Sequence, residues 1–345
     1  ESIERMAKRF VFVSKTMNAD VVFENDVDTN HAADPQPILE ARRDVIPVHA
    51  GVFTFQGDFL RVFHAINARV RGLAGELGAI EQEYPAIWPV RLFKEIDYFH
   101  QFPHQVVMCA PVKGEHATRD EFARRYSKGQ EFDSIKVDDG LLADSEYGLG
   151  PAVCDCCYYA LEGQTRVQNA FYTCYNKVFR NEHSAHGRLD RLLSFSVRDI
   201  MFIGDRHYVL EARQLLIEAL SEILGALHLN VLVATANDAF FANESAMKSV
   251  FQNSHRLKYE LLALIPHLDT RIAIGSINLH LDVFGRAFDI ETAPGVPAHS
   301  GCIGVGMERA SYALFCQHGP ELGMWPVEVL DYLELSPQPG PATGV

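Results

Sequence analysis

The sequence lacks any apolar run long enough to cross a membrane. Its richest apolar stretch, residues 215–236, is interrupted by Glu218, Glu222 and His228, whereas a membrane-spanning helix needs about 20 consecutive apolar residues. No basic region followed by an apolar core stands at the N-terminus, so a secretory signal is not expected either. Both absences argue against a membrane protein and favour a cytoplasmic location.

Basic residues are also in short supply. Lysine and arginine number 31 against 45 aspartates and glutamates, which gives a net charge of −14. A protein that binds nucleic acid neutralises phosphates with a basic surface. The acidic balance therefore argues against tRNA or DNA as a partner, although a local basic patch stays open.

Cysteine is too sparse for a disulfide scaffold. Seven cysteines, an odd number, are scattered through 345 residues, which predicts reduced thiols and leaves a metal site open. Apolar residues make up 48% of the chain. This is enough to bury a substantial core, as one large domain or as a domain with a small appendage.

Hydrophobic periodicity predicts helices and strands along the whole chain. Apolar residues recur at spacings of three and four over 58–82, which indicates a helix. Further helices are expected near 207–228 and 244–263, strands near 170–180, 192–203, 230–235, 271–278 and 283–290, and a last helix after GCIGVGMERASYALFCQHG (301–319). Hairpins in place of regular βαβ alternation predict an α+β fold, an antiparallel sheet flanked by helices.

The stretch VFRNEHSAHGRLDRLLSFSVRD (178–199) has strand-like ends around a polar loop. A solvated hairpin loop is one interpretation. Alternation along the second strand instead places Arg191, Phe195 and Asp199 on one face of the sheet. A cation, an aromatic ring and a carboxylate in line could hold a phosphate chain, a purine and a third group.

A second candidate phosphate site is GVGMER (304–309). Its two glycines allow close approach of the backbone, and Arg309 lies just inside an expected helix, where phosphate contacts are favourable. A G-x-G pattern by itself is weak evidence for such a site.

Taken together, these motifs resemble a known superfamily. The pattern F-R-x-E, a loop, R-x-x-x-F-x-x-x-[D/E] and a later G-x-G-x-E-R is similar to the second and third signature motifs of class II aminoacyl-tRNA synthetases. KYEL (258–261) and SIN (276–278) resemble seryl-tRNA synthetase segments. PAVCDCCYY, NDAFF, FPHQV and HSGCIGVGMERASYALFCQHG resemble the amino acid:[carrier protein] ligases, truncated relatives of the zinc-dependent archaeal-type seryl-tRNA synthetases. The resemblance covers about residues 60–330 and implies the class II synthetase fold.

The resemblance implies an ATP site. Arg180 would contact the α-phosphate and stabilise the charge that develops during adenylation. Glu182 would accept from the adenine amino group, and Phe195 would stack on the purine. Arg191 and Arg309 would hold the β- and γ-phosphates, which makes Arg180 and Arg309 the expected catalytic residues. Mg²⁺ is expected to accompany ATP, although the strand TRIAIGSIN offers no acid to bind it.

A zinc site is implied in the same way, with Cys154, Asp199 and Cys302 as ligands. Its fourth position would take water or the α-amine of the substrate. Asp199 stands where the family usually has glutamate, and this shorter acid brings metal occupancy or the substrate into question. Cys156 and Cys157 are candidates for an altered site. Three further cysteines are expected to be ordinary buried side chains: Cys109, Cys174 and Cys316.

The amino-acid pocket is the third implied site. Its expected lining residues are Asn237, Asp238, Lys258, Glu260 and Asn278. Salt bridges or strand-end polar groups are the alternative interpretation of these residues. The histidines, His280 included, are dispersed, and we expect them to be exposed or packed groups, not metal ligands.

The expected function is an ATP-dependent, AMP-forming ligase. It would convert a small amino acid, such as glycine or alanine, to aminoacyl-AMP and transfer it to the phosphopantetheine thiol of an acyl or peptidyl carrier protein. The alternatives are a seryl-tRNA synthetase-like enzyme acting on tRNA and a non-catalytic synthetase paralogue. By this resemblance, the N-terminal portion is too short for the separate tRNA-binding domain of the archaeal-type synthetases.

Domain and assembly expectations complete the analysis. We expect an N-terminal strand-rich extension (1–56), a catalytic domain (57–334) and a disordered, Pro/Gly-rich tail (335–345). The resemblance implies a homodimer built on residues 58–107, in which Ile87, Trp88 and Val90 would be covered. The basic cluster at 119–128, with Arg124 and Arg125 foremost, is the candidate carrier-protein contact. A solvated helix face with internal ion pairs is the alternative.

Overall fold

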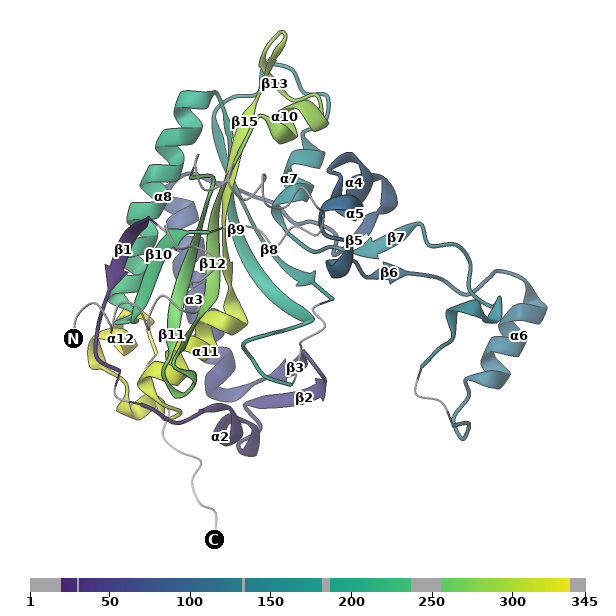
Figure 1. Ribbon diagram of the computed structural model, residues 1–345, viewed down its shortest axis with the longest axis horizontal. Helices are drawn as coiled ribbons and strands as arrows, with labels where there is room; N and C mark the ends of the chain where they lie inside the picture. Colours follow the sequence, from purple (N-terminus) through teal and green to yellow (C-terminus); the bar gives the residue numbers. More distant parts are fainter. Residues whose placement is uncertain (1–19, 30, 132–133, 182–186, 237–255, 336–345) are drawn as a thin grey trace.

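An eight-stranded sheet forms the centre of the protein (Figure 1). A computed structural model describes residues 20–29, 31–131, 134–181, 187–236 and 256–335. The strands, in spatial order, are β1 (Val21–Asn25), β10 (Val231–Thr235), β11 (Lys258–Ile265), β12 (Thr270–Leu281), β15 (His299–Gly306), β9 (Ser194–Gly204), β8 (Ala170–Phe179) and β4 (Ile80–Glu81). All neighbours are antiparallel except β4 and β8. The predicted α+β class is therefore confirmed.

Three long helices bury one face of the sheet. They are α3 (Gly57–Glu76), α8 (Arg206–Ala226) and α11 (Met307–His318). Helix α11 packs on α3 and on β11 and β12, and α8 packs on β15 and β9. Their apolar residues form the larger of two buried clusters in the described chain. The short helices α2 (Gln36–Ala41) and α12 (Val327–Tyr332), with the hairpin of β2 (Val45–His49) and β3 (Val52–Phe55), lie beside this layer.

The described elements cover only part of the opposite face. Strand β9 shows the division by alternation, because Ile200 and Phe202 belong to the larger cluster whereas Met201 and Ile203 belong to the second. Helices α4 (Val90–Glu95), α5 (Tyr98–Gln101), α7 (Cys154–Ala160) and α10 (Val283–Ala287) lie on the second side, with a small sheet of β5 (Ile87–Pro89), β7 (Tyr147–Leu149) and β6 (Met108–Cys109) and the hairpin of β13 (Glu291–Ala293) and β14 (Val296–Pro297). The part of this face that no described helix or hairpin covers holds the cavity described below.

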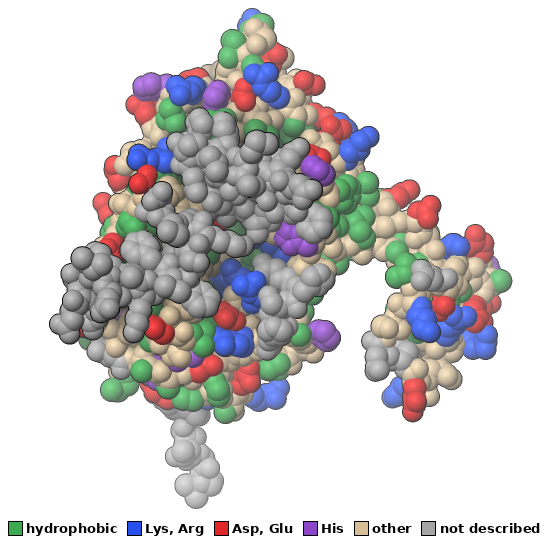
Figure 2. Space-filling model, viewed as in Figure 1, with side chains coloured by type: hydrophobic (Ala, Val, Ile, Leu, Met, Phe, Trp, Pro, Cys, Tyr) green, Lys and Arg blue, Asp and Glu red, His purple; other side chains and the backbone are tan. Residues whose placement is uncertain are grey.

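Residues 110–146 form an arm that stands apart from the body (Figure 1). Its two sides pair near the base, where Lys113 N–H donates to the Leu141 carbonyl at 3.0 Å. Helix α6 (His116–Arg125) occupies its end. In Figure 2 lysine, arginine, aspartate and glutamate side chains crowd this end of the arm.

Two secondary-structure predictions are wrong. Residues 258–263 of the predicted helix 244–263 lie in strand β11, where burial alternates residue by residue; residues 244–255 lie outside the described part. Residues 283–287 of the predicted strand 283–290 form helix α10 instead. Phe284 and Phe288, four residues apart, stack with ring centroids 6.1 Å apart. This is the spacing of neighbouring side chains on one helix face, and the strand prediction overlooked it.

The predicted helix at 58–82 ends early. Helix α3 stops at Glu76, and Gly78 follows it with φ of +66°, a left-handed conformation that glycine adopts at low cost. The predicted last helix is confirmed only in part: α12 does follow residue 319, but α11 lies within the stretch itself and carries Arg309.

Residues 20–29 and 31–56 contact the main sheet and the larger buried cluster. Strand β1 pairs with β10 at one edge of the main sheet, and Leu39 and Val45 belong to the larger buried cluster. The expected boundary at residue 57 stays a prediction. Of the expected C-terminal tail, residues 336–345 lie outside the described part.

Trp88 is covered by its own chain. Its side chain is 1% exposed, its ring lies 5.2 Å from that of Phe93, and a Cβ at Gly150 would meet its indole nitrogen at 2.5 Å. The prediction that a partner covers Trp88 is therefore wrong. Ile87, its neighbour, is 49% exposed.

Candidate active site

A cavity of about 200 Å³ opens on the partly covered face of the sheet. Strands β8, β9, β11, β12 and β15, the start of α7 and the start of α11 supply its walls. The lining residues that matter for chemistry are Cys154, Arg180, Phe195, Asp199, Lys258, Glu260, Asn278, Cys302, Glu308 and Arg309. Residues from five separate sequence motifs therefore meet in one cavity.

Arg180 and Phe195 form one side of the cavity. Arg180 follows directly on β8, and its Nε donates to the Pro151 carbonyl at 2.9 Å. Its guanidinium carbon lies 5.5 Å from the centre of the Phe195 ring, within the range of a cation–π contact. The antiparallel pairing of β8 with β9 places Val178 opposite Phe195, so the hairpin motif itself brings cation and ring together.

Arg309 lies on the other side, in the first turn of α11. Its Nη1 donates to the Ala273 carbonyl on β12 at 3.3 Å. The strand before it carries Gly304, where a Cβ would come within 2.5 Å of the Asp199 Oδ1. Only glycine fits there without displacing that carboxylate.

Glu308 fixes the two sides relative to each other. Its carboxylate is fully buried and accepts from the Ser196 backbone N–H at 2.7 Å and from the Ser196 hydroxyl at 3.0 Å. It also pairs with the Lys177 ammonium at 3.1 Å. Since Ser196 follows Phe195 and Glu308 precedes Arg309, this contact ties the aromatic side to the arginine side.

The floor of the cavity carries a second polar group. Lys258 and Glu260 on β11 form an ion pair of 3.1 Å. Opposite them on β12 lie Asn278 and Ser276, joined by a 3.1 Å hydrogen bond from the Asn278 amide to the Ser276 hydroxyl. Cation, anion and amide thus face the cavity from adjacent strands, an arrangement that suits a small zwitterion.

Two thiols and an imidazole converge beside this floor. The donor atoms of Cys154, His280 and Cys302 all lie within 4.8 Å of one another. The Cys302 sulfur is 3.7 Å from His280 Nε2 and accepts from the Asn278 amide at 3.7 Å. Three contacts lower the pKa of the Cys302 thiol: the hydrogen bond with Cys154, the His280 ring and the Asn278 amide. The same hydrogen bond, together with burial, raises the pKa of the Cys154 thiol.

Asp199 lines the same cavity but is held differently. It is 4% exposed, and burial raises the pKa of its carboxyl although the Cys154 backbone N–H donates to it. In the described part of the chain, the group of donors within 4.8 Å of one another contains His280 and not Asp199. Its neighbour in space, Asp155, is also buried, and burial raises the pKa of that carboxyl to about 6.

The donor set fits a transition metal of the zinc type. Cysteine sulfur and imidazole nitrogen are the ligands that zinc favours, and a three-residue set leaves one position for water or substrate. The three side chains come from α7, β12 and β15, all elements with fixed pairing or packing. A metal held there would lie next to the Lys258–Glu260 floor of the cavity.

The other cysteines lie elsewhere. Cys156 and Cys157 belong to the second buried cluster, and burial raises the pKa of both thiols, to about 12 for Cys157. Cys174 and Cys316 are buried as expected, but Cys109 is only half-buried.

Most of the expected site residues meet in the cavity, although their roles stay predictions. Arg191 does not line it, because this residue precedes β9 in a bend and its side chain is exposed. Three further candidates lie outside the described residues: Glu182, Asn237 and Asp238.

Sequence reasoning missed two residues of this site, His280 and Glu308. Strand alternation could have found the first, since Ser276, Asn278 and His280 follow at intervals of two along β12. A fully buried acid directly before Arg309 gave no comparable signal, because its partner Ser196 lies more than a hundred residues earlier.

The chain is similar to two curated enzymes of one family. It is 32% identical over 264 residues to amino acid–[acyl-carrier-protein] ligase 1 of Bradyrhizobium diazoefficiens, covering 76% of this chain and 78% of that protein. It is 30% identical over 255 residues to ligase 2 of the same organism, covering 73% and 74% respectively. A scan against statistical models of protein families finds no match.

Solved structures identify the fold. The seryl-tRNA synthetase of Methanopyrus kandleri, crystallised with a tRNA, superposes with a TM-score of 0.78 at 20% identity, over 99% of this chain and 71% of that one. The predicted class II aminoacyl-tRNA synthetase fold is therefore confirmed.

Proposed function

Because the chain belongs to the amino acid–[acyl-carrier-protein] ligase family, we propose that it activates a small amino acid with ATP and passes it to a carrier-protein thiol. The observation that supports this most directly is the meeting of Arg180, Phe195 and Arg309 with a small polar floor in one cavity. A nucleotide triphosphate needs cations and an aromatic face, and an amino acid needs both charge signs.

ATP binds between the two arginine sides. Phe195 offers its face to the purine, Arg180 lies at the α-phosphate, and Arg309 meets the terminal phosphates. Arg191 does not line the cavity, so in this proposal it reaches those phosphates from outside the cavity wall. The glycines of β15 allow the backbone close to the nucleotide. Mg²⁺ would be held by the phosphates themselves, since Glu260 and Glu308 of the cavity are already paired with lysine or serine groups.

Adenylation needs positioning and charge stabilisation more than acid–base chemistry. The amino-acid carboxylate oxygen attacks the α-phosphorus, the bond to the bridging oxygen breaks, and pyrophosphate leaves. Arg180 stabilises the negative charge that builds at the phosphorus in a site with little water. No proton has to move in this step.

Thioester formation follows. The sulfur of the phosphopantetheine arm attacks the acyl carbon, the C–O bond to phosphate breaks, and AMP leaves while the thiol proton passes to solvent. The acceptor thiol is that of the phosphopantetheine arm, which enters the cavity from outside. Among the described cysteines only Cys154 and Cys302 line the cavity, and both belong to the proposed metal site.

The amino acid is small because the pocket is. Its carboxylate faces Arg180, and the Lys258–Glu260 pair and Asn278 close the floor from strands β11 and β12. A zinc ion at the Cys154–Cys302 thiols would act as a Lewis acid for the α-amine and fill further volume. Glycine or alanine fits such a space.

We also propose a homodimer built on residues 58–107. In support, β4, which lies within this segment, is a two-residue strand at the edge of the main sheet. Ile80 is 52% exposed and Ile87 49% exposed. A cavity of about 520 Å³ with largely apolar walls lies beside them, lined by Tyr84, Pro85 and Leu92 among others. Sedimentation at micromolar concentration should give twice the chain mass, and a monomer would contradict the interface.

The test of function has two stages. The first is amino-acid-dependent exchange of pyrophosphate into ATP, screened over the amino acids. The second is the mass of a phosphopantetheinylated carrier protein incubated with enzyme, ATP and the active amino acid, beside a tRNA charging assay. One aminoacyl mass on the carrier protein and none on tRNA is the expected result, and the reverse would overturn the proposal in favour of a tRNA enzyme.

Arg309→Ala tests the nucleotide site within this scheme. We expect exchange to fall by at least about 100-fold, the scale of one lost charge stabiliser, with an unchanged unfolding midpoint. Arg286→Ala is the matched control, because this arginine pairs with Asp282 on the surface, away from the cavity. Exchange at the wild-type rate in Arg309→Ala would remove Arg309 from the site.

A further inference from the structure

The third donor beside the two cysteines of the cavity is a histidine. His280 Nε2 lies 3.7 Å from the Cys302 sulfur, and both lie within 4.8 Å of the Cys154 sulfur. In a tetrahedral zinc site with Zn–S near 2.3 Å and Zn–N near 2.0 Å, a sulfur and a nitrogen ligand are about 3.5 Å apart. The observed separation is thus close to that of two ligands of one ion.

The other ring nitrogen of His280 has a partner that fixes the orientation. Nδ1 lies 3.3 Å from the hydroxyl of Ser300, a fully buried residue of β15. Metal-binding histidines almost always use their second nitrogen in this way, which leaves the lone pair of the first directed at the metal. Tyr158 and Phe284 meet the ring edge-on, with centroids 5.5 and 4.8 Å away, so it has little freedom to turn.

The backbone of β12 also aims this side chain. Leu279 pairs with Gly301 and Leu281 with Ser300, so His280 is the extra residue of a β-bulge. Bulges of this kind redirect one side chain and recur next to active sites. Leu281 has φ of +56°, a conformation that a leucine adopts only under local constraint.

Asp199 lies beside this donor group and is not part of it. Its carboxylate accepts from the backbone N–H of Cys154, itself a member of the group, and packs against the space left by Gly304. The acid is one methylene shorter than glutamate, and the compact donor group of the described chain forms without it.

We propose that His280, together with Cys154 and Cys302, binds the metal ion of this cavity, and that Asp199 is not one of its ligands. The inference rests on the proposed metal-dependent recognition of the amino acid and makes it more specific. A two-sulfur, one-nitrogen set carries one negative charge less than the two-sulfur, one-carboxylate set that the family resemblance implied. The ion therefore keeps more Lewis acidity for the substrate amine.

The experiment measures metal binding, not activity. Wild type, His280→Ala, His280→Cys and Asp199→Asn are compared for zinc content by elemental analysis and for the visible spectrum after replacement with Co²⁺. His267→Ala is the matched control, because His267 is another half-buried histidine with an aromatic and an acid as neighbours. Circular dichroism checks that each variant is folded.

We expect one zinc per chain in wild type, the control and Asp199→Asn, and at least about tenfold weaker binding in His280→Ala. His280→Cys should keep the metal and gain thiolate-to-cobalt absorption, which a merely structural histidine would not produce. Zinc loss in Asp199→Asn with retention in His280→Ala would overturn the assignment. Absence of metal binding in wild type would do so too, while pyrophosphate exchange would still test the proposed function independently.

Discussion

The contact between Glu308 and Ser196 gives the sharpest stability prediction. Glu308→Ala leaves the fully buried Ser196 with a backbone N–H and a hydroxyl that lose their acceptor. An orphaned buried N–H costs about 1–3 kcal/mol, and the hydroxyl adds about 1. Lys177 is 46% exposed and can turn to water, so its ion pair adds little. We expect Glu308→Ala to lower the free energy of unfolding by about 2–4 kcal/mol.

Glu308→Gln separates hydrogen bonding from charge. The amide oxygen can accept from the Ser196 N–H while the amide nitrogen donates to the Ser196 hydroxyl, which accepts as readily as it donates. Only the half-exposed pair with Lys177 is lost, and we expect a loss of about 1 kcal/mol or less.

Urea unfolding followed by tryptophan fluorescence measures both variants. The reporters Trp88 and Trp325 are buried, one in each cluster of the described chain. Glu308→Ala should also raise the KM for ATP, because Phe195 and Arg309 flank the broken contact. Equal losses in the Ala and Gln variants, or a loss below about 0.5 kcal/mol in both, would refute the hydrogen-bond reasoning.

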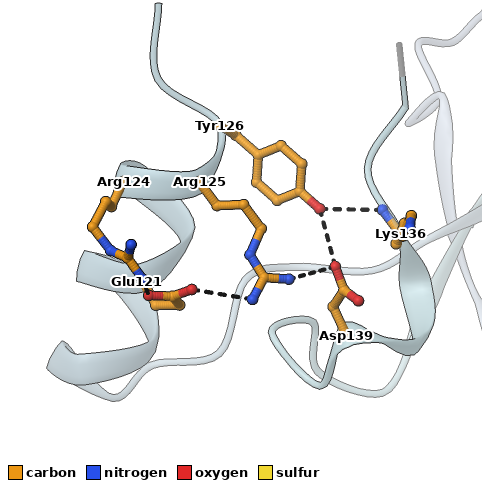
Figure 3. A network of polar contacts seen from close by, with 6 residues as sticks. All are labelled: Glu121, Arg124, Arg125, Tyr126, Lys136 and Asp139. Carbon is orange, nitrogen blue, oxygen red and sulfur yellow. Dashed lines mark hydrogen bonds and ion pairs between the residues drawn. The ribbon is translucent and has the colours of Figure 1, made fainter. Parts of the chain in front are cut away.

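Two further predictions concern the periphery. Burial lowers the pKa of His318, whose Nε2 lies 3.0 Å from the Leu227 carbonyl. As pH falls below about 6.5, the unfolded chain therefore takes up a proton before the folded chain does. The free energy of unfolding should fall in that pH window. His318→Gln should flatten this part of the pH profile of urea midpoints, and an unchanged profile would contradict the assignment. In the arm, Arg124 and Arg125 pair with Glu121, and Arg125 also pairs with Asp139 (Figure 3). If an acidic carrier protein docks there, the double Ala variant should raise the KM for carrier protein severalfold and leave pyrophosphate exchange unchanged; equal KM values would exclude this contact.

The ion pairs of the arm show how far charge patterns in a sequence can be interpreted. The basic cluster at 119–128 suggested a docking surface, with internal ion pairs as the alternative. Those pairs are present: Glu121 meets both arginines at spacings of three and four, and Asp139 meets Arg125 from the short 3₁₀ helix Val137–Asp139 on the other side of the arm. The arginines stay exposed, at 76% and 41% of their side chains, so pairing and docking do not exclude each other.

The hairpin motif was predictable because its geometry is local. Strands β8 and β9 pair in one register over ten residues, and alternation then decides which side chains share a face. The position of Phe195 beside Asp199 follows from that rule. The errors at 258–263 and 283–287 arise because the mixed polar and apolar residues of KYELLA and VFGRA fit either period over so short a segment. Pairing with β12 makes the first a strand, and this partner is invisible in the local sequence.

The metal ligands mark the limit of sequence reasoning. Spacing alone cannot show that residues 154, 280 and 302 meet, because their approach depends on the packing of α7 across β9 and on the register of β12 against β15. Had those two strands paired without interruption, Ser300 and His280 would have stood directly opposite each other as Cys302 and Asn278 do. The one-residue bulge moves Ser300 opposite Leu281 and leaves the imidazole between that hydroxyl and the Cys302 sulfur. In the proposed metal site, the bulge therefore provides a nitrogen ligand, His280. This ligand takes the place of the acid at position 199, whose side chain is one methylene shorter than glutamate.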